Sequence, residues 1–166
     1  GGPPQARAGA GTPAGHRHAR FVDLVDWLDP GDLLVVNRSA TLPASLPALG
    51  ALGPFRLNLS THYGGGVWLA EPRWSHDRPG PLPLARGETI AVAGAAARLL
   101  APYPGQGRLW FVQLGADTQR LLAVCGEPIR YGYAPQPYPL AAYQTVFAAV
   151  PGSAEMPSAG RPFPRR

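Results

Sequence analysis

The sequence predicts a mostly β protein in which a partial α/β domain is interrupted by a small inserted all-β barrel. In residues 21–37, apolar residues at helical spacing are followed by a continuous apolar run. Short strand-like segments recur from residue 55, and an apolar segment typical of a strand returns at residues 142–147. The predicted organisation is a flexible arm at 1–20, a discontinuous and incomplete α/β domain at 21–54 and 131–166, and an inserted barrel at 55–130.

The first predicted unit is a helix followed by a buried strand. Apolar residues at positions 21, 24, 25 and 28 recur at helical spacing, and Pro30-Gly31 is expected to end the helix. Residues 32–37 then form a short continuous apolar run, which is typical of a strand buried on both faces. Ahead of this unit, residues 1–15 are mainly Gly, Pro and Ala with almost no apolar anchor, which predicts a flexible arm.

The middle of the chain is predicted to be all β, because short apolar or alternating segments are separated by Gly- and Pro-rich turns. The expected strands are residues 55–60, 67–70, 88–92, 95–100, 109–114 and 119–125. Pro-rich connections are expected at residues 38–53 and 128–139, and residues 142–147 are expected to be a strand that delivers a tight loop.

Composition and charge limit the possible partners. The 166 residues include 21 Gly and 21 Pro, which predicts a loop-rich single domain or one domain with an insertion. The net charge is +5 and every basic residue is Arg, so an RNA or nucleotide partner is compatible with the charge. The arginines are scattered rather than clustered, and a bias in codon usage is the simpler explanation for them.

The single cysteine and the absence of long apolar runs narrow the class of protein further. Cys125 has no partner cysteine, which excludes an internal disulfide and an all-cysteine metal site, and we expect it to be a buried small apolar side chain. No zinc-ligand spacing is present, the first twenty residues lack a secretory signal, and no apolar run could span a bilayer. These observations predict a soluble cytoplasmic protein without a membrane span.

Two places in the sequence are candidates for a binding site. Asn37 and Ser39 directly follow the predicted buried strand, and ligands of α/β sheets bind beyond the carboxyl ends of strands. A turn in which both side chains bond to the backbone explains these residues equally well. Tyr143 and Gln144 could bond to a base or ribose, and the small residues at 157–160 would let the backbone approach a ligand. Strand packing followed by a turn is the alternative for this second place.

Several separated motifs resemble the S-adenosylmethionine:tRNA ribosyltransferase-isomerase family of queuosine biosynthesis, and they occur in the order of that family. They are Pro30-Gly31-Asp32-Leu33-Leu34-Val35-Val36-Asn37, Ala142-Tyr143-Gln144-Thr145-Val146-Phe147 and Pro157-Ser158-Ala159-Gly160. The resemblance covers residues 21–163 and is strongest at the two ends of this span. It implies an α/β domain interrupted by a small β-barrel.

The resemblance also implies a reaction. The ribosyl part of S-adenosylmethionine moves onto a 7-aminomethyl-7-deazaguanine base in tRNA, epoxyqueuosine forms, and adenine and methionine are released. S-adenosylmethionine is then a substrate, tRNA is the partner, and no metal takes part. The chemistry demands deprotonation beside the sulfonium and a cationic surface for RNA. No catalytic residue is assigned, and the residues expected to line the substrate pocket are Asn37, Ser39, Tyr143, Gln144, Ser158 and Gly160.

The chain departs from the family pattern at polar positions. Arg38-Ser39-Ala40 stands where the family has Asp-Thr-Arg, Ser45 where it has Arg, and Arg161-Pro162-Phe163 where it has Leu-His-Phe. The C-terminal half of the family is expected to be missing. A second hypothesis is therefore a truncated, non-catalytic module whose barrel binds RNA or protein. The residues that would form its binding surface are Trp68, Trp74, Trp110, Arg56, Arg73 and Arg108.

Overall fold

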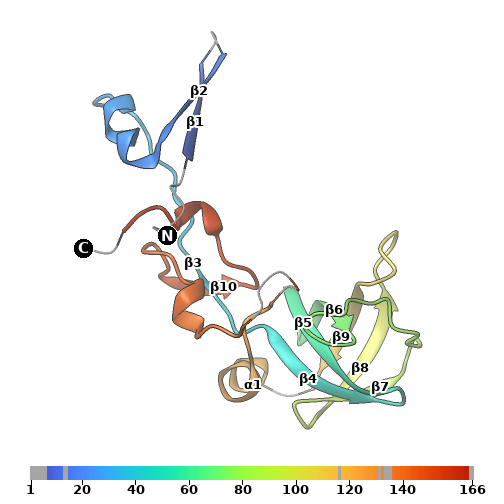
Figure 1. Ribbon diagram of the computed structural model, residues 1–166. Coiled ribbons are helices and arrows are strands. Elements are labelled where there is room, and N and C mark those ends of the chain that lie inside the picture. The colour runs from blue at the N-terminus through green and yellow to red at the C-terminus, as the bar shows by residue number, and fades with distance from the viewer. Residues whose placement is uncertain (1–6, 13–14, 116, 131, 133–135, 165–166) are drawn as a thin grey trace.

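The computed structural model describes residues 7–12, 15–115, 117–130, 132 and 136–164. Within these residues the protein is mostly β, and its largest unit is a closed antiparallel barrel (Figure 1). A parallel ribbon of two strands lies beside the barrel, and a hairpin followed by a short helix stands apart from it. The predicted mostly β fold with a small barrel is confirmed.

The barrel strands meet in the order β4–β5–β6–β9–β8–β7, and pairing of β4 with β7 closes the barrel. Their bounds are Ser45–Gly50 (β4), Gly53–Gly64 (β5), Val67–Arg73 (β6), Thr89–Val92 (β7), Ala95–Pro102 (β8) and Trp110–Leu114 (β9). Closure pairs the strand edges with one another, which protects them from pairing with other chains. The sequence predictions for β5 through β9 are confirmed to within a few residues at each end.

Alternating side chains of these strands fill the barrel interior. The side chains of Leu46, Leu57, Leu59, Leu99 and Val112 have no exposed surface. Successive side chains of a strand point to opposite faces, so each strand contributes every second residue to this core. Burying one such side chain contributes about 1.5–3 kcal/mol, and the barrel is therefore the main source of stability in the molecule.

Strand β4 lies in the segment that was expected to be a Pro-rich connection. Burial alternates along β4 as in other barrel strands, since Leu46 and Ala48 are buried and Pro47 between them is exposed. Proline lacks an N–H group, so its presence argues against a strand in the sequence pattern. The barrel thus begins ahead of the expected start at residue 55, while the division of the chain into domains stays a prediction.

Residues 119–125 form a helix, and the prediction of a strand there is wrong. Helix α1 (Thr118–Cys125) begins after Asp117, whose Oδ1 accepts hydrogen bonds from the N–H groups of Gln119 and Arg120 at 3.0 and 3.3 Å. Such a cap satisfies backbone donors that the first turn of a helix leaves free. Cys125 is partly buried at the end of this helix and packs against the core.

The ribbon beside the barrel consists of β3 (Ser39–Thr41) and β10 (Val150–Ser153), which pair in parallel. It joins two parts of the chain that are more than a hundred residues apart. The strand predicted at 142–147 is wrong, because η2 (Leu140–Tyr143) occupies its beginning and turns follow. The strand that carries the final loop is β10 instead, and the loop contains η3 (Ser158–Gly160).

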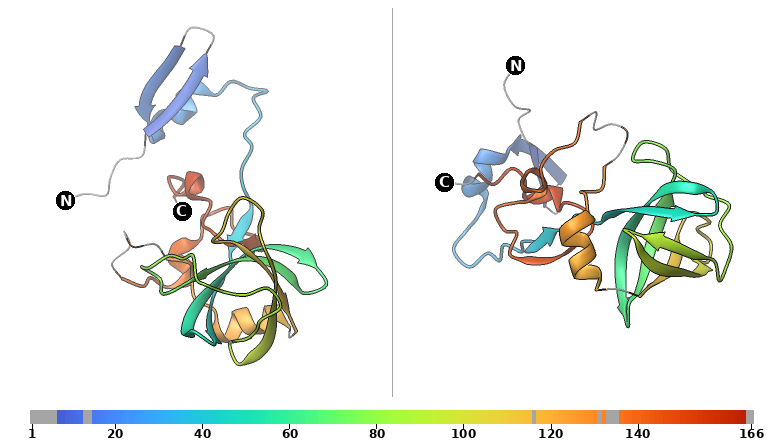
Figure 2. Two further views of the ribbon diagram at one scale, coloured as in Figure 1. Left: turned by 90° about the vertical axis from the view of Figure 1, so that its right-hand side faces the viewer. Right: turned by 90° about the horizontal axis from the view of Figure 1, so that it is seen from below.

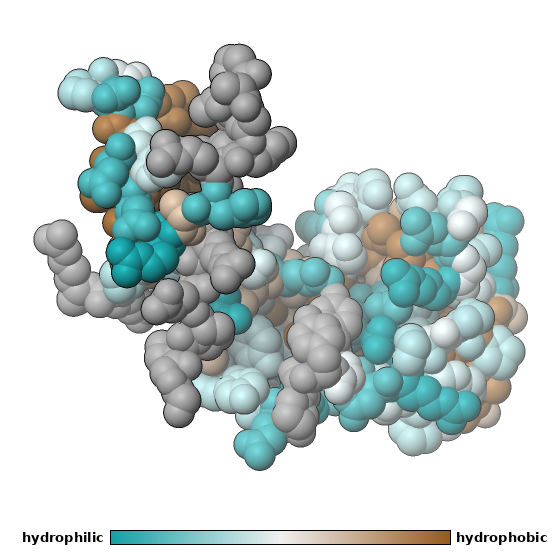
Figure 3. Space-filling model, turned by 45° about the horizontal axis from the view of Figure 1, so that its top comes forward, coloured by the Kyte–Doolittle hydropathy of each residue, from teal (hydrophilic) through white to brown (hydrophobic). Residues whose placement is uncertain are grey.

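Residues ahead of the ribbon form a separate hairpin and helix. Strands β1 (Arg7–Thr12) and β2 (Gly15–Arg20) pair where a flexible arm was expected, and residues 1–6 and 13–14 lie outside the described residues. The helix predicted at 21–28 is confirmed as η1 (Phe21–Trp27), which has 3-10 geometry. Figure 3 shows apolar atoms at the surface of this N-terminal unit, where Val22 and Val25 are exposed.

Residues 32–37 do not form a buried strand, and that prediction is wrong. They belong to an extended segment that runs between η1 and β3 (Figure 2). Leu33 is 86% exposed and Val35 is 82% exposed. No strand among the described residues pairs with this segment, so its apolar side chains have no sheet to enter.

No helix in the described part of the chain is long and apolar enough to cross a membrane.

Candidate functional site

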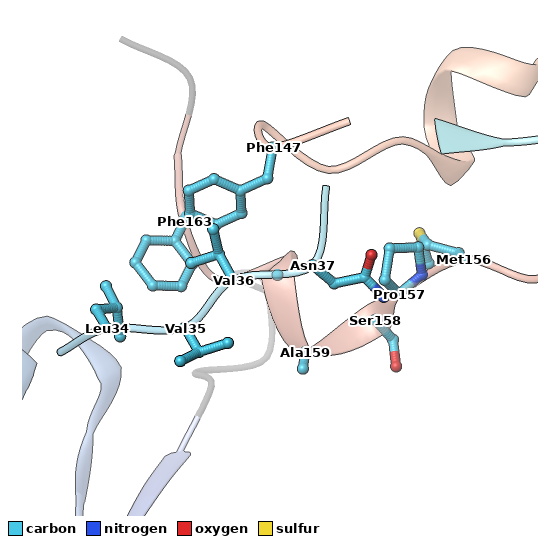
Figure 4. Close-up of a pocket in the computed structure, with 11 residues that line it drawn as sticks. Leu34, Val35, Val36, Asn37, Phe147, Met156, Pro157, Ser158, Ala159 and Phe163 are labelled. Atoms are coloured by element: carbon cyan, nitrogen blue, oxygen red, sulfur yellow. The ribbon is translucent and has the colours of Figure 1, made fainter. Parts of the chain in front are cut away.

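A cavity of about 370 Å³ lies where the extended segment before β3 meets the final loop (Figure 4). Residues 34–37 form one part of its wall, and residues 156–160, which include η3, form another. Phe147 and Phe163 complete the lining. We call this space the ribbon cavity, because β3 and β10 hold its two walls together.

Backbone hydrogen bonds fix the two walls of the ribbon cavity. The carbonyl oxygen of Arg38 accepts the N–H groups of Ala149 and Val150 at 2.9 and 3.1 Å. Arg38 directly follows the wall residue Asn37, and the β3–β10 pairing continues from this point. The two distant segments are therefore positioned by a strand ladder rather than by side-chain contacts alone.

Gln144 strengthens the same connection. Its Nε2 donates to the carbonyl oxygen of Thr41, and its Oε1 accepts the N–H of Thr41, each at 2.8 Å. The hydroxyl of Thr41 donates to the carbonyl oxygen of Tyr143 at 2.8 Å. The Gln144 amide thus makes the two hydrogen bonds with the Thr41 backbone that a neighbouring strand would otherwise make. It is engaged in positioning β3 and does not line the ribbon cavity.

Aromatic side chains form one end of the ribbon cavity. Phe163 lies between Phe21 and Phe147, with ring centroids 4.7 and 4.8 Å apart and edge-to-face geometry. This arrangement is favourable for aromatic pairs, because the positive edge of one ring meets the negative face of the next. Figure 4 shows Phe147 and Phe163 at one end, with Asn37 and Ser158 at the other.

The turn of η3 depends on a glycine. A Cβ atom on Gly160 would lie 3.0 Å from Cγ2 of Thr145, closer than ordinary van der Waals contact. Thr145 is only 4% exposed, so it has little room to move. A residue without a side chain at position 160 therefore allows the final loop to pack against Thr145 and to close the wall of the cavity.

The polar groups of the ribbon cavity come from Asn37 and Ser158. Oδ1 of Asn37 accepts the N–H of Ser39 at 2.8 Å, which is the backbone-bonded turn considered as the alternative for this motif. The side chain of Asn37 is nevertheless exposed and lines the cavity together with Ser158. An amide and a hydroxyl can both donate and accept hydrogen bonds, which suits a neutral polar ligand group.

The structure brings together some of the residues predicted for the site. Asn37, Ser158 and Gly160 all line the ribbon cavity. Ser39, Tyr143 and Gln144 lie beside it and hold β3 in place, and their expected contact with a ligand stays a prediction. The apolar lining residues 34–36 were not predicted for the site, because their continuous apolar run indicated a strand buried in a sheet.

A polar cluster of different composition joins the barrel to the segment after α1. Arg56 donates to the hydroxyl and carbonyl oxygens of Ser45 at 3.1 and 2.8 Å, and to Glu127 at 3.2 Å. Nε2 of His76 lies 3.0 Å from Glu127. Burial, followed by the positive charges of Arg56 and Arg130, lowers the pKa of His76 below 6.5, although Glu127 opposes this shift.

The six residues expected to form the binding surface of the second hypothesis differ in how far they are exposed. Trp68 and Trp110 are 9 and 6% exposed and belong to the barrel core. Arg73 is 5% exposed and is held by hydrogen bonds to Glu71 and to the carbonyl oxygen of His76. Trp74 and Arg56 are partly buried and Arg108 is exposed, so these six described residues do not form one exposed row of the kind that binds single-stranded RNA. Among the described residues, no group of three or more His, Cys, Asp or Glu side chains could hold a metal ion.

Comparison with known proteins bears directly on the ribbon cavity. Residues 9–166 match the protein family described as queuosine biosynthesis protein, and this match includes both walls of the cavity. The chain belongs to the queuosine biosynthesis protein family. The family resemblance stated from the sequence motifs is thereby confirmed.

Individual relatives agree with the family assignment. The chain is 38% identical over 155 residues to the S-adenosylmethionine:tRNA ribosyltransferase-isomerase of Rubrobacter xylanophilus. It is 35% identical over 161 residues to the protein of the same name from Anaeromyxobacter dehalogenans, and 32% identical over 150 residues to that from Thermus thermophilus. These matches cover 92, 93 and 88% of this chain but only 43, 45 and 43% of the relatives. The chain thus spans less than half the length of the curated relatives it matches, and no solved structure matches it.

Proposed function

We propose that this chain contributes the S-adenosylmethionine site of a tRNA ribosyltransferase-isomerase, and that the ribbon cavity is this site. In the proposed reaction, the ribosyl part of S-adenosylmethionine is transferred to a 7-aminomethyl-7-deazaguanine base in tRNA, and epoxyqueuosine forms. Family membership and the names of the relatives support the reaction. The proposed action on tRNA places the protein in the cytoplasm.

The observation that carries the proposal is the convergence of two distant motifs on one cavity. Residues 34–37 and 156–160 form its walls, although more than a hundred residues separate them in the sequence. A volume of about 370 Å³ lies within the range of small-molecule sites, which is roughly 300–1,000 Å³. Residues 34–37 and 157–160 of these walls belong to the motifs by which the sequence resembles the family.

The lining matches the parts of S-adenosylmethionine. The Phe147 and Phe163 rings offer an apolar aromatic surface against which adenine can pack. At the other end, Asn37 and Ser158 can hydrogen bond to ribose hydroxyls. Gly160 lets the final loop pack against Thr145, which keeps this wall of the cavity in place. Ser39, Tyr143 and Gln144 have a positioning role in this proposal, through β3 and its contacts.

The partner in this proposal is tRNA. The net charge of +5 attracts a polyanion, and the contribution of each neutralised phosphate weakens as salt concentration rises. The reaction itself requires removal of a proton from the carbon beside the sulfonium. None of the residues of the ribbon cavity is assigned to that step.

Calorimetric titration with S-adenosylmethionine tests the proposal. Ala159 is exposed and lines the ribbon cavity, so Ala159→Phe places a ring in the space for the ligand without filling the core. We expect the unchanged protein to bind and the variant to lose binding at least tenfold. Ala123→Phe, at an exposed position of α1, is the matched control and should bind normally. Absence of binding to the unchanged protein at millimolar ligand, or equal binding by both variants, contradicts the proposal.

A further inference from the structure

Residues 21–29 repeat a pattern of two apolar side chains followed by an aspartate. The three triplets are Phe21-Val22-Asp23, Leu24-Val25-Asp26 and Trp27-Leu28-Asp29. Residues 21–27 form η1, which has 3-10 geometry. A 3-10 helix has three residues per turn, so side chains three positions apart lie in one row. The period of the sequence therefore equals the period of the helix, and each position of the triplet forms a separate row along η1.

The first position of each triplet packs against the rest of the protein. Phe21, Leu24 and Trp27 are all partly buried. The ring of Phe21 meets that of Phe163 edge to face, with centroids 4.7 Å apart. Aromatic pairs in this geometry are favourable. This row therefore anchors η1, and the other two rows are left to face outward.

The second position of the triplets forms an exposed apolar row. Val22 and Val25 are 71 and 72% exposed, and Leu28, which directly follows the helix, is 41% exposed. We call these three residues the outer row. Figure 3 shows apolar atoms at the surface of this N-terminal unit. Single apolar side chains are common on protein surfaces, whereas apolar side chains gathered in one place mark interaction sites.

The third position places acidic side chains beside the outer row. Asp23 pairs with Arg20 at 3.3 Å. Asp26 and Asp29 are exposed, and neither forms an ion pair among the described side chains. Residues 21–37 contain four aspartates and no arginine, although the whole chain has a net charge of +5. The outer row consequently lies in an acidic part of a basic protein.

We propose that the outer row binds a basic amphipathic helix of a partner protein. Apolar side chains of that helix cover Val22, Val25 and Leu28, and its lysines or arginines lie beside Asp26 and Asp29. The outer row is about 12 Å long at a rise of about 2 Å per residue, which matches roughly two turns of an α-helix. No residue of the outer row lines the ribbon cavity, so this docking surface is independent of the proposed function.

The charge beside the outer row decides between possible occupants. Nucleic acid and anionic membrane surfaces are repelled by unpaired aspartates. A second copy that paired through the same row would bring the aspartates of both copies together, which is unfavourable. A basic amphipathic helix gains both from the burial of apolar surface and from opposite charge.

Fluorescence anisotropy with a labelled synthetic peptide tests the proposal. The probe is a peptide of about four helical turns with leucine and lysine at amphipathic spacing, and its counterpart has glutamate in place of lysine. Because the protein has a net charge of +5, its other surfaces repel the basic peptide on average. We expect the basic peptide to bind and the acidic peptide not to bind.

Substitutions then locate the binding surface. Val22→Ser combined with Val25→Ser should weaken binding of the basic peptide at least tenfold, because two apolar contacts are lost. Val124→Ser replaces a valine that is 75% exposed on α1, and this matched control should bind normally. Equal binding of the two peptides, or binding that the double valine variant leaves unchanged, overturns the proposal.

The contribution of charge is tested separately. Asp26→Asn removes the charge and keeps the shape of the side chain, so it should weaken binding of the basic peptide about threefold and reduce its dependence on salt. Asp77→Asn, at an exposed carboxylate of the barrel side, is the control and should bind normally. Self-association of the protein alone that is lost in the double valine variant, measured by sedimentation, would assign the outer row to a second copy. Binding to phosphatidylglycerol vesicles that is lost in that variant would assign it to a membrane, and either result overturns the proposal.

Discussion

Gly160 and Gln144 maintain the ribbon cavity for different physical reasons. Gly160 is needed for space, because a Cβ atom there would lie only 3.0 Å from Cγ2 of Thr145. Gln144 is needed for its hydrogen bonds, because Thr41 is buried and depends on this side chain as a partner for both its N–H and its carbonyl group. Buried backbone groups that lose such partners are costly, typically by about 1–3 kcal/mol each.

The close contact at Gly160 leads to a direct prediction. Gly160→Ala should lower the free energy of unfolding by about 1 kcal/mol or more, because the added methyl group meets the buried Thr145. S-adenosylmethionine binding should fall with it. Gly107→Ala is the matched control, since a Cβ atom there meets nothing within 4 Å. Thermal and urea unfolding measure the stability of both variants. Equal stability would show that Thr145 moves to make room for the methyl group at no cost in free energy.

The hydrogen bonds of Gln144 lead to a second prediction. Gln144→Ala should destabilise the protein by about 1–3 kcal/mol and speed hydrogen exchange at the Thr41 amide. Gln119→Ala replaces an exposed glutamine on α1 and should change neither quantity. Hydrogen-exchange NMR provides the comparison. Unchanged protection of Thr41 in Gln144→Ala would mean that this side chain does not hold β3.

At the scale of elements, the sequence pattern predicted those parts that depend on local alternation. Five barrel strands follow from apolar periodicity and glycine turns. Asn37, Ser158 and Gly160 were grouped by the family resemblance, and the structure places them around one cavity. Residues 32–37 and 119–125 were assigned wrongly because short apolar runs fit a buried strand or a helix equally. Residues 32–37 could form a strand only with a partner strand beside them. Residues 119–125 form a helix because Asp117 caps its first turn. The role of Gln144 depends on a contact 103 residues away, which no local pattern contains.

The contact between the barrel and the segment after α1 should depend on pH through His76. Because its pKa is lowered in the folded protein, the unfolded chain binds the proton more readily. The stability that neutral His76 contributes is fully present above its ordinary pKa of 6.5, and it is lost as pH falls through the pKa of the folded state. We expect the loss of stability between pH 7.5 and 5.5 to be smaller in His76→Ala than in His18→Ala. Identical losses in the two variants would remove His76 as the cause.

At the scale of the whole molecule, stability and ligand binding reside in different parts. The barrel contains the fully buried side chains, whereas the ribbon cavity lies between an extended segment and a loop. Sites are often built in this way, with loops placed by a rigid scaffold. Loss of barrel packing should therefore unfold the protein, whereas changes in the extended segment should not.

A pair of identical substitutions tests this separation. Leu46→Ala removes a side chain without exposed surface from β4 and should lower the free energy of unfolding by about 2–5 kcal/mol. Leu33 is 86% exposed, so Leu33→Ala should change stability by less than about 0.5 kcal/mol. Urea unfolding followed by tryptophan fluorescence measures both. A large loss in Leu33→Ala would show that the extended segment is packed in solution.

The central claim is that residues 34–37 and 156–160 form one ligand site. Amide NMR spectra recorded during titration with S-adenosylmethionine test it most directly, because they report each wall separately. We expect the largest shifts at Val36, Asn37, Ser158 and Gly160 together, with the barrel strands unchanged. Shifts confined to the barrel, or shifts of only one wall, would contradict the claim.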